Sequence, residues 1–130
     1  MEKEFIPYNE ALALKELGFD EPCFMTYLNG KLDKELFLFN HSIRSHSTQE
    51  FTSAPLYQQC WRWFREKHNL ECHIKSLYEQ RENKGFYFGV ADTYRDFYSK
   101  PYYSYEEAEL ECLKKLIEIV KAKNKNEEQK

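Results

Sequence analysis

The chain has 130 residues, enough for one domain with a single core and too few for two. Its formal net charge of −3 argues against a protein dedicated to duplex DNA, because such proteins usually carry a basic patch or stripe. The N-terminal residues MEKEFIPYNE lack the apolar region of a signal peptide, and no apolar run approaches the length of a membrane span. We therefore expect a cytoplasmic protein that does not contact a membrane.

The first third of the chain predicts a helix followed by a β-hairpin. Residues 7–17 (PYNEALALKEL) begin with proline and carry an apolar stripe at helical spacing, and Gly18 suits the residue after a helix. Two runs rich in β-forming residues then flank Asn29 and Gly30. Asn-Gly is the strongest short-range signal for a hairpin, because both residues tolerate positive φ.

Residues 40–53 contain mainly Ser, Thr, His and Gln and have no apolar period. A connection of this length without regular structure is uncommon in a compact domain and is usually functional or mobile. Ser53 is expected to cap a helix that continues to about His68. The apolar residues of that helix form two adjacent rows, which would give a face wide enough to lie on a sheet.

The second half predicts two further strands and a long helix. The strands are expected at residues 70–77 and 85–91, and an aromatic-rich loop, which could include a short edge strand, follows Asp92. Ser104 and Glu107 form a capping box at the start of a helix that reaches about Lys121. Residues 122–130 are charged and are expected to fray.

These elements predict an α+β fold with the order α-β-β-α-β-β-α. An antiparallel four-stranded sheet with helices on one face satisfies the apolar pattern and the short connections. Residues 1–121 would form this single domain, and residues 122–130 would form a charged tail.

The polar loop before the second helix is the first candidate ligand site. A helix start offers free backbone N–H groups and a positive dipole end to an anion, and an arginine can bind phosphate or carboxylate through two hydrogen bonds. The alternative is a solvated loop that only satisfies its own backbone. The candidate binding residues here are His41, Arg44, His46, Thr48 and Ser53.

The aromatic run after Asp92 is the second candidate. Aromatic faces beside Arg95 or Lys100 could stack on a nucleobase. The candidate stacking residues are Tyr98 and Tyr102. The same side chains could instead fold down as a small satellite core, or serve as anchors in a protein interface.

Catalysis and metal binding have weaker support. The histidines and the four cysteines lack the close pairs of zinc sites, so we expect no metal and no cofactor. Asp92 and Asp96 lie near a strand end, where acid–base groups can sit, but they also suit turns. A hydrolase acting through Asp92 or a histidine is therefore a third hypothesis, with no nucleophile assigned.

Three stretches carry a resemblance to a group of known proteins: FIPYNEALALKELGFDEPCF, APLYQQCWRWFREKHNL and YEEAELECLKKLIEIVK. Across its whole length the chain resembles uncharacterised short proteins encoded by phages and mobile elements of gut Bacteroidales. The resemblance implies a cytoplasmic accessory protein of a phage or prophage, and it supplies no catalytic motif.

The sequence therefore leads to two functional hypotheses. The first is a non-enzymatic protein that binds a small anionic or nucleotide-like ligand, for instance to sequester an immune signal. The alternative is an interaction module that uses exposed aromatics to bind a second copy of itself or a host protein.

Overall fold

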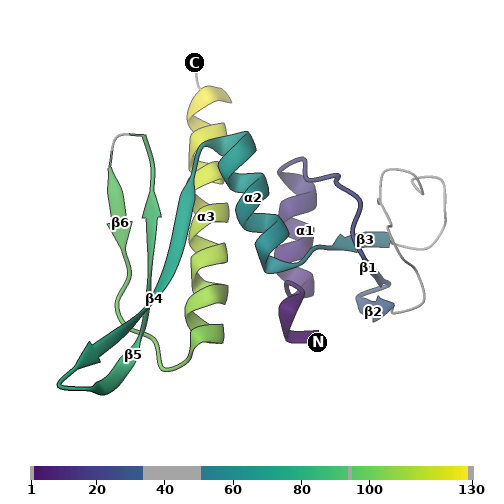
Figure 1. Cartoon of the computed structure of the whole chain (residues 1–130). Coiled ribbons are helices and arrows are strands. Elements are labelled where there is room, and N and C mark those ends of the chain that lie inside the picture. The colour runs from purple at the N-terminus through teal and green to yellow at the C-terminus, as the bar shows by residue number, and fades with distance from the viewer. Residues whose placement is uncertain (1, 34–50, 94, 129–130) are drawn as a thin grey trace. The chain divides into compact units, whose positions relative to one another are not determined.

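The computed structural model describes residues 2–33, 51–93 and 95–128. The chain belongs to the α+β class and divides into two compact units, residues 1–60 and 61–130 (Figure 1). Helix α2 (Tyr57–His68) begins in the first unit and ends in the second. The single domain expected from the chain length stays a prediction.

The first unit is a short antiparallel sheet with one covering helix. The sheet has the strand order β2-β1-β3, and β1 pairs with both neighbours. Helix α1 contacts β3, where the Lys15 ammonium donates to the Phe51 carbonyl at 3.3 Å. The elements of this unit that precede α2 are the 3₁₀ helix η1 (Glu2–Glu4), α1 (Tyr8–Glu16), β1 (Met25–Leu28), β2 (Lys31–Asp33) and β3 (Phe51–Ala54).

Local sequence signals decide the turns of this unit. Pro7 stands at the N-cap of α1, and Gly18 follows the helix with φ of 99°. Asn29 and Gly30 both have positive φ and connect the paired residues Leu28 and Lys31. The predicted first helix and the predicted hairpin are therefore confirmed.

Strand β3 and the adjoining half of β1 are buried even at polar positions. All residues of β3 are buried, and the hydroxyls of Thr26 and Thr52 lie inside. The Thr26 hydroxyl donates to the Thr52 carbonyl at 2.8 Å, whereas the Thr52 hydroxyl has no hydrogen-bond partner within the described residues. A buried polar group without a partner costs stability, so Thr52 is a weak point of this core.

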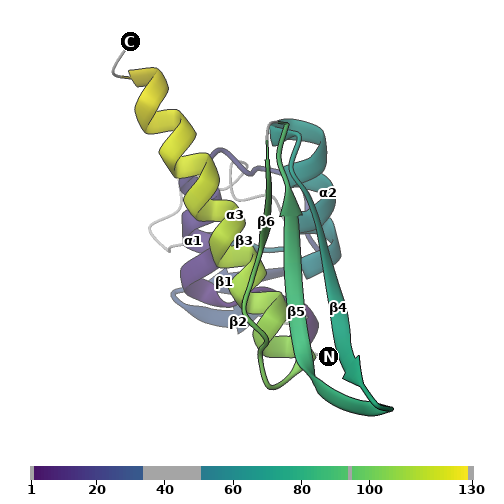
Figure 2. The ribbon, with the colours of Figure 1, turned by 90° about the vertical axis from the view of Figure 1, so that its left-hand side faces the viewer.

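The second unit is a longer antiparallel sheet with the strand order β4-β5-β6. The turn between β4 and β5 is formed by Gln80 and Arg81, which both have positive φ. Helix α3 contacts β5 and β4, and Figures 1 and 2 both show it alongside the strands. The elements after α2 are β4 (Glu71–Glu79), β5 (Glu82–Ala91), β6 (Asp96–Tyr98) and α3 (Tyr105–Glu128).

The two faces of this sheet have different surroundings. Phe88 and Val90 on β5 lie on the face toward α3, together with their β4 partners Ile74 and Cys72. Gly89 lies on the opposite face, which we call the outer face, with His73 and Tyr98 on either side. A Cβ atom on Gly89 would come within 2.5 Å of the His73 ring, so only glycine fits between these rings without displacing them.

The capping box of the last helix is confirmed. The Glu107 N–H donates to the Ser104 hydroxyl at 3.1 Å, and the Glu107 carboxylate accepts from the Tyr103 N–H at 3.1 Å. The helix then continues to Glu128, beyond the end expected near Lys121.

Two structural predictions are wrong. The four-stranded sheet is replaced by two three-stranded sheets, because residues 51–54 form strand β3 and pair with β1. Ser53 lies inside that strand and does not cap α2, which begins only at Tyr57. The residues FTSA contain phenylalanine and threonine, which suit a strand that has a partner elsewhere in the chain.

No helix among the described residues combines the length and the apolar character needed to cross a lipid bilayer.

Candidate functional site

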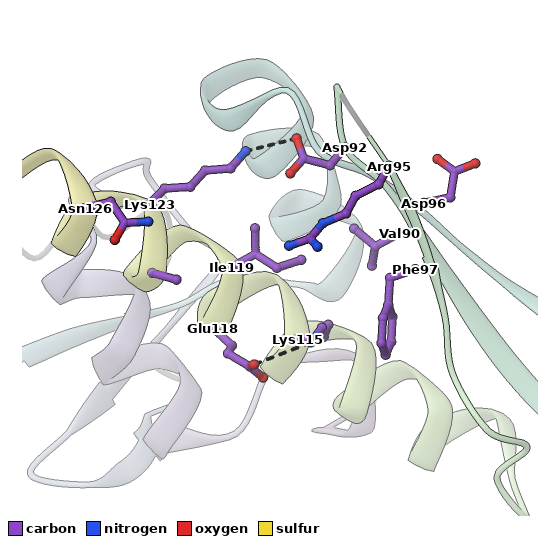
Figure 3. A pocket seen from close by; sticks show the side chains of 11 residues that line it. Val90, Asp92, Arg95, Asp96, Phe97, Lys115, Glu118, Ile119, Lys123 and Asn126 are labelled. Carbon is purple, nitrogen blue, oxygen red and sulfur yellow. Dashed lines mark hydrogen bonds and ion pairs between the residues drawn. The ribbon is translucent and has the colours of Figure 1, made fainter.

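A cleft in the second unit lies between the β5–β6 connection and the C-terminal half of α3. Its volume is about 460 Å³, within the size range of pockets for small ligands. Figure 3 shows side chains from both walls directed into the space between them. The lining residues that carry charge are Asp92, Arg95, Asp96, Lys115, Glu118 and Lys123; the aromatic one is Phe97.

Hydrogen bonds of Asp92, Thr93 and Arg95 stabilise the strand wall of the cleft at the connection between β5 and β6. The Asp92 N–H donates to the Arg95 carbonyl at 3.0 Å, and the Thr93 N–H donates to the Asp92 carboxylate at 2.7 Å. The Thr93 hydroxyl accepts a further hydrogen bond, at 3.2 Å, from the Asn69 amide. These hydrogen bonds connect Asp92, Thr93 and Arg95 with one another and with Asn69.

The Asp92 carboxylate also joins this turn to α3. It accepts from the Lys123 ammonium at 3.0 Å (Figure 3). Burial alone would raise the pKa of Asp92, but the hydrogen bonds from Lys123 and Thr93 and the charges of Lys123 and Arg95 lower it. The carboxylate is therefore ionised at neutral pH and already bonded to a cation, which does not favour it as a general base.

Lys115 has two neighbours on the other side of the cleft. Its ammonium lies 3.4 Å from the Glu118 carboxylate and 4.3 Å from the centre of the Phe97 ring. The Phe97 ring in turn contacts Phe88 beneath it, with ring centres 5.9 Å apart. Lys115 is thus held by an ion pair and a cation–π contact, and its position in the cleft is defined.

Arg95 differs from both lysines. Its guanidinium makes no hydrogen bond and no ion pair with any residue in the described part of the chain. Figure 3 shows the side chain crossing from the strand wall toward Ile119 on α3, between the two ion pairs. The cleft therefore presents a cation whose hydrogen-bond donors remain available to a ligand.

Three of the seven binding residues predicted from the sequence, Ser53, Tyr98 and Tyr102, belong to the described part of the chain. His41, Arg44, His46 and Thr48 lie outside the described residues, so their roles stay predictions. Ser53 is buried in the first unit.

The two predicted stacking residues, Tyr98 and Tyr102, lie on opposite faces of the sheet. Tyr98 contacts His73 on the outer face, and the Tyr102 ring stacks on Phe88 with ring planes 11° apart. They cannot hold one ligand between them.

Arg95 and Asp92 are recognisable as candidates in the sequence, but their contact with α3 is not. The missing signal was the four-residue spacing of Lys115, Ile119 and Lys123, which places these side chains on one face of a helix. Nothing in that spacing identifies the sheet turn that the face meets.

Within residues 2–33, 51–93 and 95–128, no three His, Cys, Asp or Glu side chains come together in a way that could hold a metal ion.

Comparisons with protein-family models, with curated proteins and with solved structures found no match for this chain.

Proposed function

We propose that this chain binds a small anion in the cleft between the β5–β6 connection and α3, with Arg95 as the main contact. The observation that carries the proposal is the guanidinium of Arg95, which lies in the cleft and makes no hydrogen bond or ion pair with the described residues. A planar guanidinium can donate two parallel hydrogen bonds to a phosphate or a carboxylate. Such charge-assisted bonds give orientation as well as affinity.

The two lysines of the cleft can contribute to the same anion. Each is paired with a carboxylate at the protein surface, and pairs of this kind contribute little to stability. Exchanging part of the Asp92–Lys123 or Glu118–Lys115 contact for a bound anion therefore costs little. The three cations would then surround the ligand from both walls.

The charge balance of the cleft favours a small ligand over a polyanion. Its three cationic side chains are matched by three carboxylates, Asp92, Asp96 and Glu118. In Figure 3 the Asp96 side chain points away from α3, so it lies at the rim. A long nucleic acid would meet these carboxylates repeatedly, whereas one phosphate or carboxylate group can approach Arg95 alone.

A nucleotide is the larger form of ligand within this proposal. Phe97 could stack on a base, but the Lys115 ammonium lies over its ring and would have to move aside. The anionic group would therefore supply most of the binding energy. Sequestration of a nucleotide immune signal by a phage or prophage protein, as the sequence resemblance implies, is the specific form of this proposal, and it requires binding without turnover.

Isothermal titration of the full chain tests the proposal. The ligand panel is inorganic phosphate, pyrophosphate, acetate, nucleoside monophosphates and cyclic dinucleotides, at low and high salt. The test variant is Arg95→Gln, and the matched control is Arg65→Gln on α2, which removes the same charge from an exposed position outside the cleft.

We expect Arg95→Gln to weaken binding by about tenfold or more, in line with the loss of a charge-assisted hydrogen-bond pair. Arg65→Gln should bind like the wild type. The proposal is wrong if no ligand in the panel produces heat at high protein concentration, or if both variants lose binding equally. Release of a hydrolysed product from any nucleotide would instead favour the hydrolase hypothesis.

A second candidate function is supported by the exposed aromatics of the second unit. Tyr98 is 61% exposed on the outer face, and Tyr103 is 93% exposed just before α3. Tyrosine is favoured as an interface anchor, so these residues could bind a second copy of the chain or a host protein. Light scattering of the wild type and of the double variant Tyr98→Ala/Tyr103→Ala tests self-association. If the wild type is a monomer, self-association is excluded and binding of a host protein remains.

A further inference from the structure

The second unit contains a pair of cysteines that the anion-binding proposal does not use. Cys72 lies on β4 and is partly exposed, and Cys112 lies on α3 with 0% exposure. Both are free thiols. Cys72 pairs with Val90 across the sheet, and Val90 lies on the face that meets α3. The side chain of Cys72 is therefore directed toward the helix that carries Cys112.

The contacts at the two ends of α3 fix the level of Cys112 along the sheet. Tyr105 at the start of the helix contacts Phe86, and Lys123 near its end contacts Asp92. From Tyr105 to Cys112 the helix rises about 10 Å, and from Phe86 to Val90 the strand rises about 13 Å. Cys112 thus reaches the level of Phe88 and Val90 on β5.

The β4 partners of Phe88 and Val90 are Ile74 and Cys72. The titration properties of the thiols agree with this placement. A hydrogen bond with the Cys72 thiol, followed by burial, raises the pKa of Cys112. The pKa of Tyr105 is also raised, mainly by burial and further by the nearby charges of Glu109, Cys72 and Cys112. Tyr105 is therefore close to both thiols. The two sulfurs are therefore neighbours on the inner side of the sheet.

We infer that Cys72 and Cys112 are a site of reversible oxidation, at which a peroxide converts the two thiols into a disulfide between β4 and α3. Cys72 is the more accessible thiol and reacts first: its sulfur attacks one oxygen of hydrogen peroxide, the O–O bond breaks, and a sulfenic acid and one water form. The sulfur of Cys112 then attacks the sulfur of Cys72. The S–O bond breaks, and a second water leaves with the proton of Cys112. Two electrons pass from the thiols to the peroxide.

The consequence for the fold is a covalent link between its last helix and its sheet. Lys115 follows Cys112 by about one turn of α3, and Val90 lies opposite Cys72, so the link sits beside the anion cleft. The closed loop runs from residue 72 to residue 112 and restricts the unfolded chain. Oxidation is therefore expected to raise Tm by on the order of 5 °C, and a dithiol reductant should reverse the rise.

Peptide mapping without reduction tests this inference on the full chain after treatment with hydrogen peroxide. We expect one cross-linked peptide pair containing residues 72 and 112 in the wild type and in the control Cys60→Ala, and none in Cys72→Ser. Cys72→Ser changes a partly exposed position, so it should fold, and its Cys112 should stay reduced because it is buried.

Overoxidation of Cys72 to the sulfinic or sulfonic acid with Cys112 still a thiol would overturn the inference. A cross-link of Cys72 to Cys23 or Cys60 would overturn it as well. The mapping needs no anion, so its failure would leave the proposed function untouched.

Discussion

The two sheets of this protein are similar in topology but differ in how far their strands are buried. Each has three antiparallel strands with one strand pairing on both sides. In the first unit β3 is buried at every position, including the polar Thr52 and Ser53. In the second unit β4 alternates between exposed and partly buried residues before becoming fully exposed, and the edge strand β6 carries the exposed side chains of Phe97 and Tyr98. Strand β3 therefore belongs to the core of the first unit, whereas the sheet of the second unit presents large side chains to solvent.

The largest difference in stability is expected between substitutions on the two faces of the second sheet, the inner face toward α3 and the outer face. Phe88 is 2% exposed on the inner face and Tyr98 is 61% exposed on the outer face. Phe88→Ala should lower the free energy of unfolding by about 3–5 kcal/mol, because it leaves a cavity under α3. Tyr98→Ala should cost less than about 1 kcal/mol, the value of its ring contact with His73. Urea unfolding of both variants measures this; equal losses would mean that the outer face is covered.

Alkaline unfolding compares the buried thiols of the two units. Burial, reinforced by the charge of Glu21, raises the pKa of Cys23 in the first unit from 9.0 to about 12. Above pH 9.0 the unfolded chain releases this proton while the folded chain retains it. The contribution of the thiol to the free energy of unfolding is therefore fully present below pH 9.0 and is lost as pH rises toward 12. The loss should approach about 1.4 kcal/mol per pH unit for this thiol.

Cys23→Ala should remove that part of the alkaline slope, and Cys112→Ala should remove the corresponding part in the second unit. Urea midpoints taken below and above pH 9.0 measure the slopes. A wild-type slope that neither variant reduces would mean that these thiols ionise in the folded protein.

A smaller effect concerns the buried threonines of the first sheet. Thr26→Val removes a buried hydrogen bond and should destabilise the chain by about 1 kcal/mol. Thr52→Val removes a hydroxyl that has no partner among the described residues and should stabilise the chain by about 1 kcal/mol. Thermal or urea unfolding of the pair decides it: destabilisation by both variants would show that the Thr52 hydroxyl is bonded.

The parts of the fold that were predictable depend on neighbouring residues. Asn29 and Gly30 form a hairpin turn wherever two strands flank them, and Ser104 with Glu107 starts a helix through hydrogen bonds within one turn. Strand β3 was not predictable, because its pairing of Met25 with Ala54 joins residues far apart in the chain. The single four-stranded sheet failed for this reason.

The candidate site was less predictable than the fold. Arg95 lies in the β5–β6 turn, whereas Lys115 and Lys123 lie on a helix that begins ten residues later. Only the packing of α3 on the sheet brings these charges together. The sequence also does not indicate that both lysines form ion pairs whereas Arg95 forms none with the described residues, and this difference carries the functional proposal.

The most direct test of the anion cleft is a two-dimensional ¹H–¹⁵N NMR titration of the full chain with inorganic phosphate. We predict that the amide signals of the turn around Arg95 and of α3 near Lys115 and Lys123 shift with saturation, while those of β1 and β3 do not move. In Arg95→Gln the saturating shifts should disappear, and in Arg65→Gln they should persist. Shifts that do not saturate, that lie in the first unit, or that survive Arg95→Gln unchanged would contradict the account.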